Sequence, residues 1–310
     1  MSIVLSVTIP VFIVIAIGYI AVWRGFMNDQ HIDGLWKFAQ GFAIPCLLFK
    51  AIWQLDLGND FNSPILPAYY SGSLVNFLLG YFGAKLIFKR SIEDSISIGF
   101  TAMFANAVLL GLAINGRAYG LESIPSAYAI IAIHAPFCYL IGITAMEIAK
   151  SEKLKIKELF LSVSKAIFKN SLMIGIGLGF LANFMELTLP SAASDALNLI
   201  VRAALPAALF GLGGVLVRYN PKGDLRLIAY LCIISLIIHP LITLTISSTF
   251  FTLQPEVFYP AVITAAMAPG MNAFMFANMY GNAKQIAAST VLVGTVFSVF
   301  TVSIWLLILT

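Results

Sequence analysis

The sequence predicts an all-α integral membrane protein whose ten transmembrane helices form two inverted five-helix repeats. Three observations predict this fold. Of the 310 residues, 60% are hydrophobic and only 10% are charged, whereas soluble domains typically carry about 25% charged residues. Apolar runs long enough to span a bilayer recur along the whole chain. Two short motifs of the first half also return in the second half with the same spacing.

A membrane-spanning helix needs about 20 apolar residues, and the chain has ten such runs. They cover residues 3–23, 34–54, 65–88, 95–114, 124–148, 166–185, 193–217, 225–249, 257–280 and 285–309. We expect no cleavable signal peptide, because the first run is too long and no small-residue cleavage site follows it. Since the connections are short, we expect no domain outside the membrane.

Lysine and arginine are distributed unevenly between the connections. The loops after the first, third, fifth, seventh and ninth runs, together with the run ends beside them, hold fifteen of the 18 basic residues, whereas the opposite loops hold only Arg117. Cytoplasmic loops are enriched in lysine and arginine. This bias predicts a multi-pass protein of the cell membrane with both termini outside and a basic cytoplasmic loop at residues 150–165, which could also contact anionic lipid. Topology therefore explains the net charge of +4, and we expect no nucleic-acid partner.

The internal repeat is visible in two pairs of segments at an offset of 161 residues. They are 17–21 (IGYIA) with 178–182 (LGFLA), and 43–49 (AIPCLLF) with 204–210 (ALPAALF). Each repeat holds five helices, and because five is odd, the second copy must lie inverted in the membrane. This architecture is typical of secondary carriers. We expect a first repeat at 1–149 and a second at 166–310.

The ninth run contains a sequence that breaks helices, AAMAPGMNAFMFANMYG at residues 265–281. Pro269 lacks a backbone donor, Gly270 tolerates unusual conformations, and Asn272 follows at once. In hydrocarbon every freed backbone group needs a partner, so such a break usually lines a cavity or packs inside protein. A simple proline kink is the alternative interpretation.

The repeat pairs this break with the fourth run, because Asn106-Ala107 loosely matches Asn272-Ala273. The fourth run has no proline, but Asn106 lies at its middle and Gly111 follows. If both helices are broken, they cross near the midplane with two helix N-termini pointing to the centre, which favours an anion such as a carboxylate. Asn106 and Asn272 would contact this substrate, satisfy the broken backbone, or do both.

Three further polar residues lie inside apolar runs. Arg202 could pair with a substrate carboxylate, extend to the outer interface, or pair with Asp195. His134 and His239 each lie near a proline and could bind substrate or relay a proton. A neutral histidine hydrogen-bonded within the bundle is the alternative for both.

The acidic residues and cysteines exclude several kinds of site. All 14 acidic residues lie at predicted helix ends or in loops. This pattern favours transport driven by membrane potential and gradient, or histidine-linked proton coupling, over sodium symport. The three cysteines are scattered through apolar runs and suggest neither disulfides nor a metal site. Enzyme motifs such as HExxH, GxSxG and the P-loop are absent, and we expect no cofactor.

An ordered set of motifs covers the whole chain. It consists of Gly18, Arg24-Gly25-Phe26, Pro45-x-x-Leu48-Phe49, Asn106 with Gly111, Pro269, Tyr280-Gly281, Ala287-Ala288-Ser289 and Thr295-x-x-Ser298. This set resembles the auxin efflux carrier family, whose bacterial members are described as malate or malonate permeases. The family departs from this chain at Ala113, where relatives often have proline, and at Ala268, which separates Met267 from Pro269.

The resemblance implies a fold similar to that of the bile-acid:sodium symporters. A scaffold domain would comprise helices 1, 2, 6 and 7 and could form a homodimer, and a transport domain would comprise helices 3–5 and 8–10. Substrate would bind where helices 4 and 9 cross, and transport would be elevator-like. The site would then include Asn106, Gly111, Pro269, Gly270 and Asn272, with His134 beside it. A polytopic intramembrane enzyme or a receptor-like membrane sensor is the alternative function, and the enzyme would need a polar cluster on adjoining helices.

Overall fold

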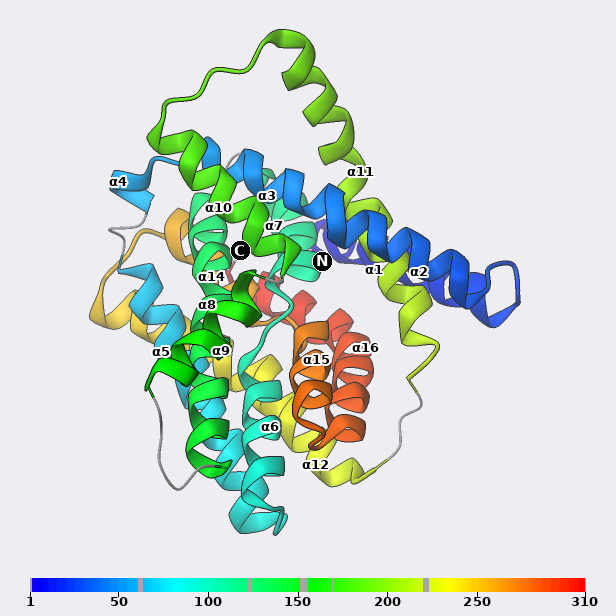
Figure 1. Ribbon diagram of the computed structural model, residues 1–310, viewed down its shortest axis with the longest axis vertical. Helices are drawn as coiled ribbons and strands as arrows, with labels where there is room; N and C mark the ends of the chain where they lie inside the picture. Colours follow the sequence, from blue (N-terminus) through cyan, green and yellow to red (C-terminus); the bar gives the residue numbers. More distant parts are fainter. Residues whose placement is uncertain are drawn as a thin grey trace. The chain divides into compact units, whose positions relative to one another are not determined.

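The computed structural model describes residues 2–60, 64–121, 124–150, 156–168, 170–219 and 223–309 (Figure 1). Within these ranges all the named elements are helical, which confirms the all-helical class. Six helices are long and apolar enough to cross a membrane: Val4–Trp23, Asp29–Trp53, Pro125–Lys150, Ser191–Leu216, Leu225–Phe250 and Lys284–Leu309. Two of the other predicted runs are interrupted, as described below, and a third holds the shorter apolar helix Ser171–Phe184.

The chain folds into two compact units. Unit 1 comprises Met1–Thr8, Ser63–Lys165 and Tyr219–Thr310, and unit 2 comprises Ile9–Asn62 and Ala166–Arg218. Each unit is therefore assembled from segments that lie far apart in the sequence.

Unit 2 is built from helices of the first, second, sixth and seventh predicted runs. Its elements are α1 (Ser2–Trp23), which begins in unit 1, α2 (Asp29–Phe38), the π-helical turn η1 (Ala39–Ala43), α3 (Ile44–Trp53), α4 (Leu57–Asp60), α10 (Ser171–Phe184) and α11 (Ser191–Leu216). Glycine allows α1 and α11 to touch through their backbones. A Cβ at Gly18 would overlap the carbonyl oxygen of Phe210, and one at Gly213 would overlap that of Ile15. Close approach at small residues is a common way to pack membrane helices.

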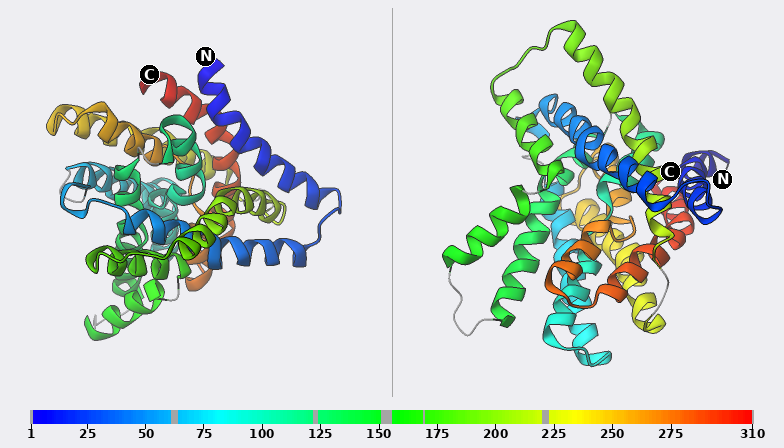
Figure 2. Two further views of the ribbon diagram at one scale, coloured as in Figure 1. Left: turned by 90° about the horizontal axis from the view of Figure 1, so that it is seen from above. Right: turned by 45° about the vertical axis from the view of Figure 1, so that its right-hand side comes forward.

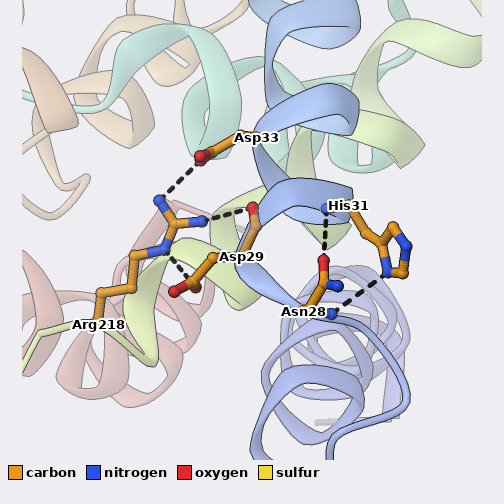
Figure 3. A network of polar contacts seen from close by, with 5 residues as sticks. All are labelled: Asn28, Asp29, His31, Asp33 and Arg218. Atoms are coloured by element: carbon orange, nitrogen blue, oxygen red, sulfur yellow. Dashed lines mark hydrogen bonds and ion pairs between the residues drawn. The ribbon is translucent and has the colours of Figure 1, made fainter.

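A polar network joins the end of α11 to the start of α2 (Figure 3). Arg218 donates to the carboxylates of Asp29 (2.9 Å) and Asp33 (2.7 Å) and to the carbonyl of Asp29 (2.9 Å). Asn28 caps α2 by accepting from the N–H of His31 at 3.0 Å. Burial lowers the pKa of the Arg218 guanidinium, but the hydrogen bonds and charges of Asp33 and Asp29 outweigh burial and raise this pKa above its ordinary value.

Unit 1 holds the remaining helices, including the two that are interrupted. Its elements are α5 (Ile65–Phe82), η2 (Gly83–Ile87), α6 (Ile92–Met103), η3 (Ala107–Gly111), α7 (Leu112–Tyr119), α8 (Pro125–Lys150), most of α9 (Ile156–Phe168), α12 (Leu225–Ile233), η5 (Ile234–Ile238), α13 (His239–Thr245), η6 (Ile246–Phe250), α14 (Pro255–Ala265), α15 (Met271–Tyr280) and α16 (Lys284–Leu309). The orange α15 and red α16 run side by side (Figures 1 and 2). Every residue of α6 from Ser95 to Met103 is buried, so α6 lies at the centre of unit 1.

The basic loop predicted at residues 150–165 is partly helical. Residues 151–155 lie outside the described ranges, but α9 begins at Ile156 and continues to Phe168. Its apolar residues recur at helical spacing between lysines, and Val163 is buried. The many lysines of this segment predicted a solvated loop, whereas its apolar residues form one face of a helix.

Candidate functional site at the two interrupted helices

The fourth predicted helix is interrupted without a proline. α6 ends at Met103, residues 104–106 are not helical, and the chain becomes helical again at η3. Asn106 starts the new helix, because its side-chain oxygen accepts from the N–H of Leu109 at 3.3 Å. The break thus lies seven residues before Ala113, where relatives often have proline. The Asn106 cap marks the break here, whereas Pro269 marks the break in the ninth predicted helix.

The ninth predicted helix is interrupted between Ala265, where α14 ends, and Met271, where α15 begins. Gly270 has a φ of −83°, which any residue can adopt. The unusual conformation that the sequence predicted for this glycine is therefore absent. Glycine is needed here because the two chain segments pack closely: a Cβ at Gly270 would lie 3.3 Å from the Cα of Asn106.

The two breaks pair with each other, and we call residues 104–106 and 268–270 the crossing. Asn106 N–H donates to the Ala268 carbonyl (2.8 Å), and Gly270 N–H donates to the Phe104 carbonyl (2.9 Å). Between these bonds, Ala105 and Pro269 form an isolated antiparallel bridge. Opposed residues at such a position exchange no hydrogen bonds. Pro269 therefore loses no bond here by lacking an N–H.

Side chains of neighbouring helices satisfy the carbonyls that the break in α6 leaves free. Asn76 and Ser235 both donate to the Ala102 carbonyl at 3.2 Å, and Ser73 donates to the Met103 carbonyl at 3.4 Å. Helix ends inside a membrane need such partners. These residues of α5 and η5 were not singled out in the sequence, where isolated polar residues in apolar runs carry no pattern.

An unpaired side-chain donor and a helix start without a side-chain cap lie at the crossing. The Nδ2 atom of Asn106 is buried and has no hydrogen-bond partner among the described residues, and Asn106 itself is 6% exposed. Gly270 has no side chain with which to cap α15, so the first N–H groups of this helix lack a side-chain acceptor. The start of α15 also carries the positive end of the helix dipole. The crossing can therefore donate hydrogen bonds to a negatively charged group.

Asn272 lies in the first turn of α15, beside a group of aromatic rings. Its side-chain oxygen accepts from the Tyr139 hydroxyl at 3.4 Å. The rings of Phe100 and Phe276 stack at 3.9 Å, and Tyr139 lies against both. No sequence pattern predicted these aromatic residues, because phenylalanine and tyrosine are frequent throughout the chain.

The two candidate histidines, His134 and His239, both lie against the ring of Tyr69. His134 is 4% exposed and contacts the ring of Phe104, with 4.7 Å between centroids. His239 is 1% exposed and lies 3.3 Å from the Tyr69 carbonyl oxygen. The ring of Tyr69 is 5.8 Å from His134 and 4.8 Å from His239. His134 thus adjoins the crossing through Phe104, whereas His239 lies beyond Tyr69.

The remaining two candidates, Gly111 and Arg202, show no contact among the described residues that favours a role in binding. The N–H of Gly111 donates to the Asn106 carbonyl at 3.0 Å, but a Cβ at Gly111 would make only ordinary contacts, the nearest at 3.6 Å. Arg202 belongs to unit 2, where it is exposed on α11. No ion pair joins Arg202 to Asp195 within the described residues.

A family model described as "Membrane transport protein" matches residues 3–306. The chain belongs to this family. The match confirms the resemblance to the auxin efflux carriers. The transporter is also 21% identical over 298 residues to a protein from Rhizobium meliloti (strain 1021) named "Putative malonate transporter", and the match covers 96% of this chain and 93% of that protein. Both findings indicate a transporter and not an enzyme.

Proposed function

We propose that the chain carries small organic anions, namely carboxylates such as malate, malonate or auxin-like acids, across the cytoplasmic membrane. The observation that carries this proposal is the crossing, where the buried Nδ2 atom of Asn106 has no hydrogen-bond partner among the described residues. An unpaired buried donor costs about 1–3 kcal/mol. A carboxylate oxygen would remove this cost and would also accept from the start of α15.

The charge of the surroundings supports an anion. No acidic side chain is among the buried residues of the described part of unit 1, so nothing there repels a carboxylate. Neutral amides and a helix N-terminus are the donors. The name of the relative from Rhizobium meliloti refers to malonate, a carboxylate of this kind.

An elevator-type mechanism agrees with the division of the chain. Unit 2 holds helices 2, 6 and 7 and helix 1 from Ile9 onward, and the resemblance assigns these four helices to the scaffold. Unit 1 contains the crossing and would be the transport domain. The proposed architecture is ten membrane-spanning helices in two inverted repeats, with both termini outside the cell and with homodimers formed through the scaffold.

Uptake into liposomes tests the substrate contact directly. Replacing Asn272 with Ala removes an amide from the first turn of α15, and we expect uptake of labelled carboxylate to fall to background. Folding should persist, because Asn272 is only partly buried and its bond from Tyr139 is long. Gly177→Ala is the control, since open space surrounds Gly177. Uptake by Asn272→Ala at the wild-type rate would show that the site is elsewhere.

A further inference from the structure

An apolar groove runs along unit 1 between α5–η2 and α12. Its volume is about 520 Å³, within the range of small-molecule sites. It is lined by Val75, Leu78, Leu79, Phe82, Gly83, Leu86, Ile87 and Tyr230. The only hydroxyl in the lining is occupied, because Tyr230 donates to the Leu79 carbonyl at 2.9 Å. The groove therefore offers an occupant apolar contacts and no free hydroxyl donor.

Gly83 shapes the groove, and the groove length along α5–η2 matches a lipid chain. A Cβ at Gly83 would overlap the ring of Tyr230, so glycine lets α12 approach the π-helical turn η2. Leu86 and Ile87 remain 59% and 66% exposed. The lining residues span Val75 to Ile87, which is roughly 18 Å at 1.5 Å per residue. One leaflet of a bilayer has a hydrocarbon depth of about 15 Å, so one acyl chain matches the groove in length.

One end of the groove is basic. Lys89 and Arg90 follow its last lining residue, Ile87. Arg226 lies one turn before Tyr230 and therefore on the same face of α12. Asp224 balances only one of these charges, through its ion pair with Arg90 at 3.3 Å.

The basic end has unused capacity for an anion. Lys89 and Arg226 are exposed and form no ion pair within the residues that the structure describes. The Nε atom of Arg90 is buried and has no acceptor there. A phosphate placed among these groups would receive charge-assisted hydrogen bonds.

We propose that this groove binds an anionic phospholipid, with one acyl chain along α5–η2 and the phosphate at Lys89, Arg90 and Arg226. The excess of basic residues in the loops at this end assigns the lipid to the cytoplasmic leaflet, where anionic lipids are concentrated. This lipid site does not depend on which anion the crossing binds.

Native mass spectrometry tests the proposal on the full chain, extracted from liposomes of equal parts phosphatidylglycerol and phosphatidylcholine. We expect the wild type to retain phosphatidylglycerol in preference. The double variant Lys89→Gln/Arg226→Gln should weaken this preference by about fivefold for each cation removed. Leu86→Trp should reduce the retention of phosphatidylglycerol by filling the groove.

The control variant Lys157→Gln/Lys165→Gln removes the same charge from exposed positions on α9, a helix that contributes no residue to the groove lining. It should retain phosphatidylglycerol as the wild type does. Equal retention of both lipids by the wild type, or an equal loss of preference in the control, would overturn the proposal. The charge variant decides the result even if Leu86→Trp fails to fold, because Lys89 and Arg226 are exposed.

Discussion

At the scale of the single residue, Asn106 both holds the crossing together and offers a hydrogen-bond donor to a substrate. Its N–H bonds across the crossing, its side-chain oxygen caps η3, and its carbonyl accepts from Leu110 and Gly111. Of the polar groups of Asn106, only the Nδ2 donors find no acceptor among the residues that the structure describes. The backbone and the cap thus hold the amide in place, and the unused donors are available to a ligand.

Two substitutions of Asn106 separate its structural role from its role in binding. Asn106→Asp keeps the capping oxygen, but it removes the donor and puts a carboxylate where the substrate anion would lie. We expect carboxylate uptake to fall at least tenfold, because hydrogen bonds to charged groups are worth about 1.5–3 kcal/mol, with little change in melting temperature. Asn106→Ala also loses the cap, which should lower the free energy of unfolding by about 1 kcal/mol. Wild-type uptake by Asn106→Asp would contradict this assignment.

At this scale the sequence predicted the residues that the internal repeat marks, and it missed those that only tertiary contacts bring together. The repeat pointed to Asn106, and the helix-breaking sequence of the ninth run pointed to Pro269 and Gly270. These three residues meet at the crossing. Tyr139 was missed because an aromatic residue in an apolar helix has no local signature. Arg202 was singled out for its charge in a predicted span, but it lies in unit 2.

At the scale of the element, apolar runs predicted helix bounds well where the helix is continuous. The run 193–217 corresponds to α11 at Ser191–Leu216. The π-helical turns, such as η2 at Gly83–Ile87, could not be predicted, because one added residue per turn scarcely changes the apolar pattern. The break after α6 had no proline to signal it, and only the match with the ninth run pointed to it.

The paired breaks predict losses of stability of different size for two adjacent substitutions. Gly270→Val would press against the Cα of Asn106, and overpacking of this kind typically costs 1–3 kcal/mol. Pro269→Ala keeps both hydrogen bonds of the crossing and should lower the free energy of unfolding by less than about 1 kcal/mol. Thermal unfolding in detergent measures both. A larger loss of stability in Pro269→Ala than in Gly270→Val would refute the role given to glycine.

At the scale of the whole molecule, composition alone predicted a helical membrane protein, and the resemblance predicted a transporter. The division into two units could not be derived from composition, since unit 2 combines Ile9–Asn62 with Ala166–Arg218. Contacts between distant segments create that division, and a single sequence does not display them.

The positions of the acidic residues lead to a prediction about coupling. Sodium is a hard cation that prefers oxygen ligands, carboxylates among them, yet all 14 acidic residues lie at predicted helix ends or in loops. We expect carboxylate uptake into liposomes to be unchanged when a sodium gradient is replaced by a choline gradient. Uptake that requires sodium would refute this prediction and leave the anion site itself intact.

Ligand-dependent thermal unfolding of the purified protein tests the central claim most directly. A ligand that binds the folded state stabilises it by about 2.7 kcal/mol at one hundred times its dissociation constant. We predict that at least one mono- or dicarboxylate raises the melting temperature of the wild type with increasing concentration, and that it leaves Asn106→Asp unchanged. No shift with any carboxylate, or the same shift in Asn106→Asp, would contradict the account.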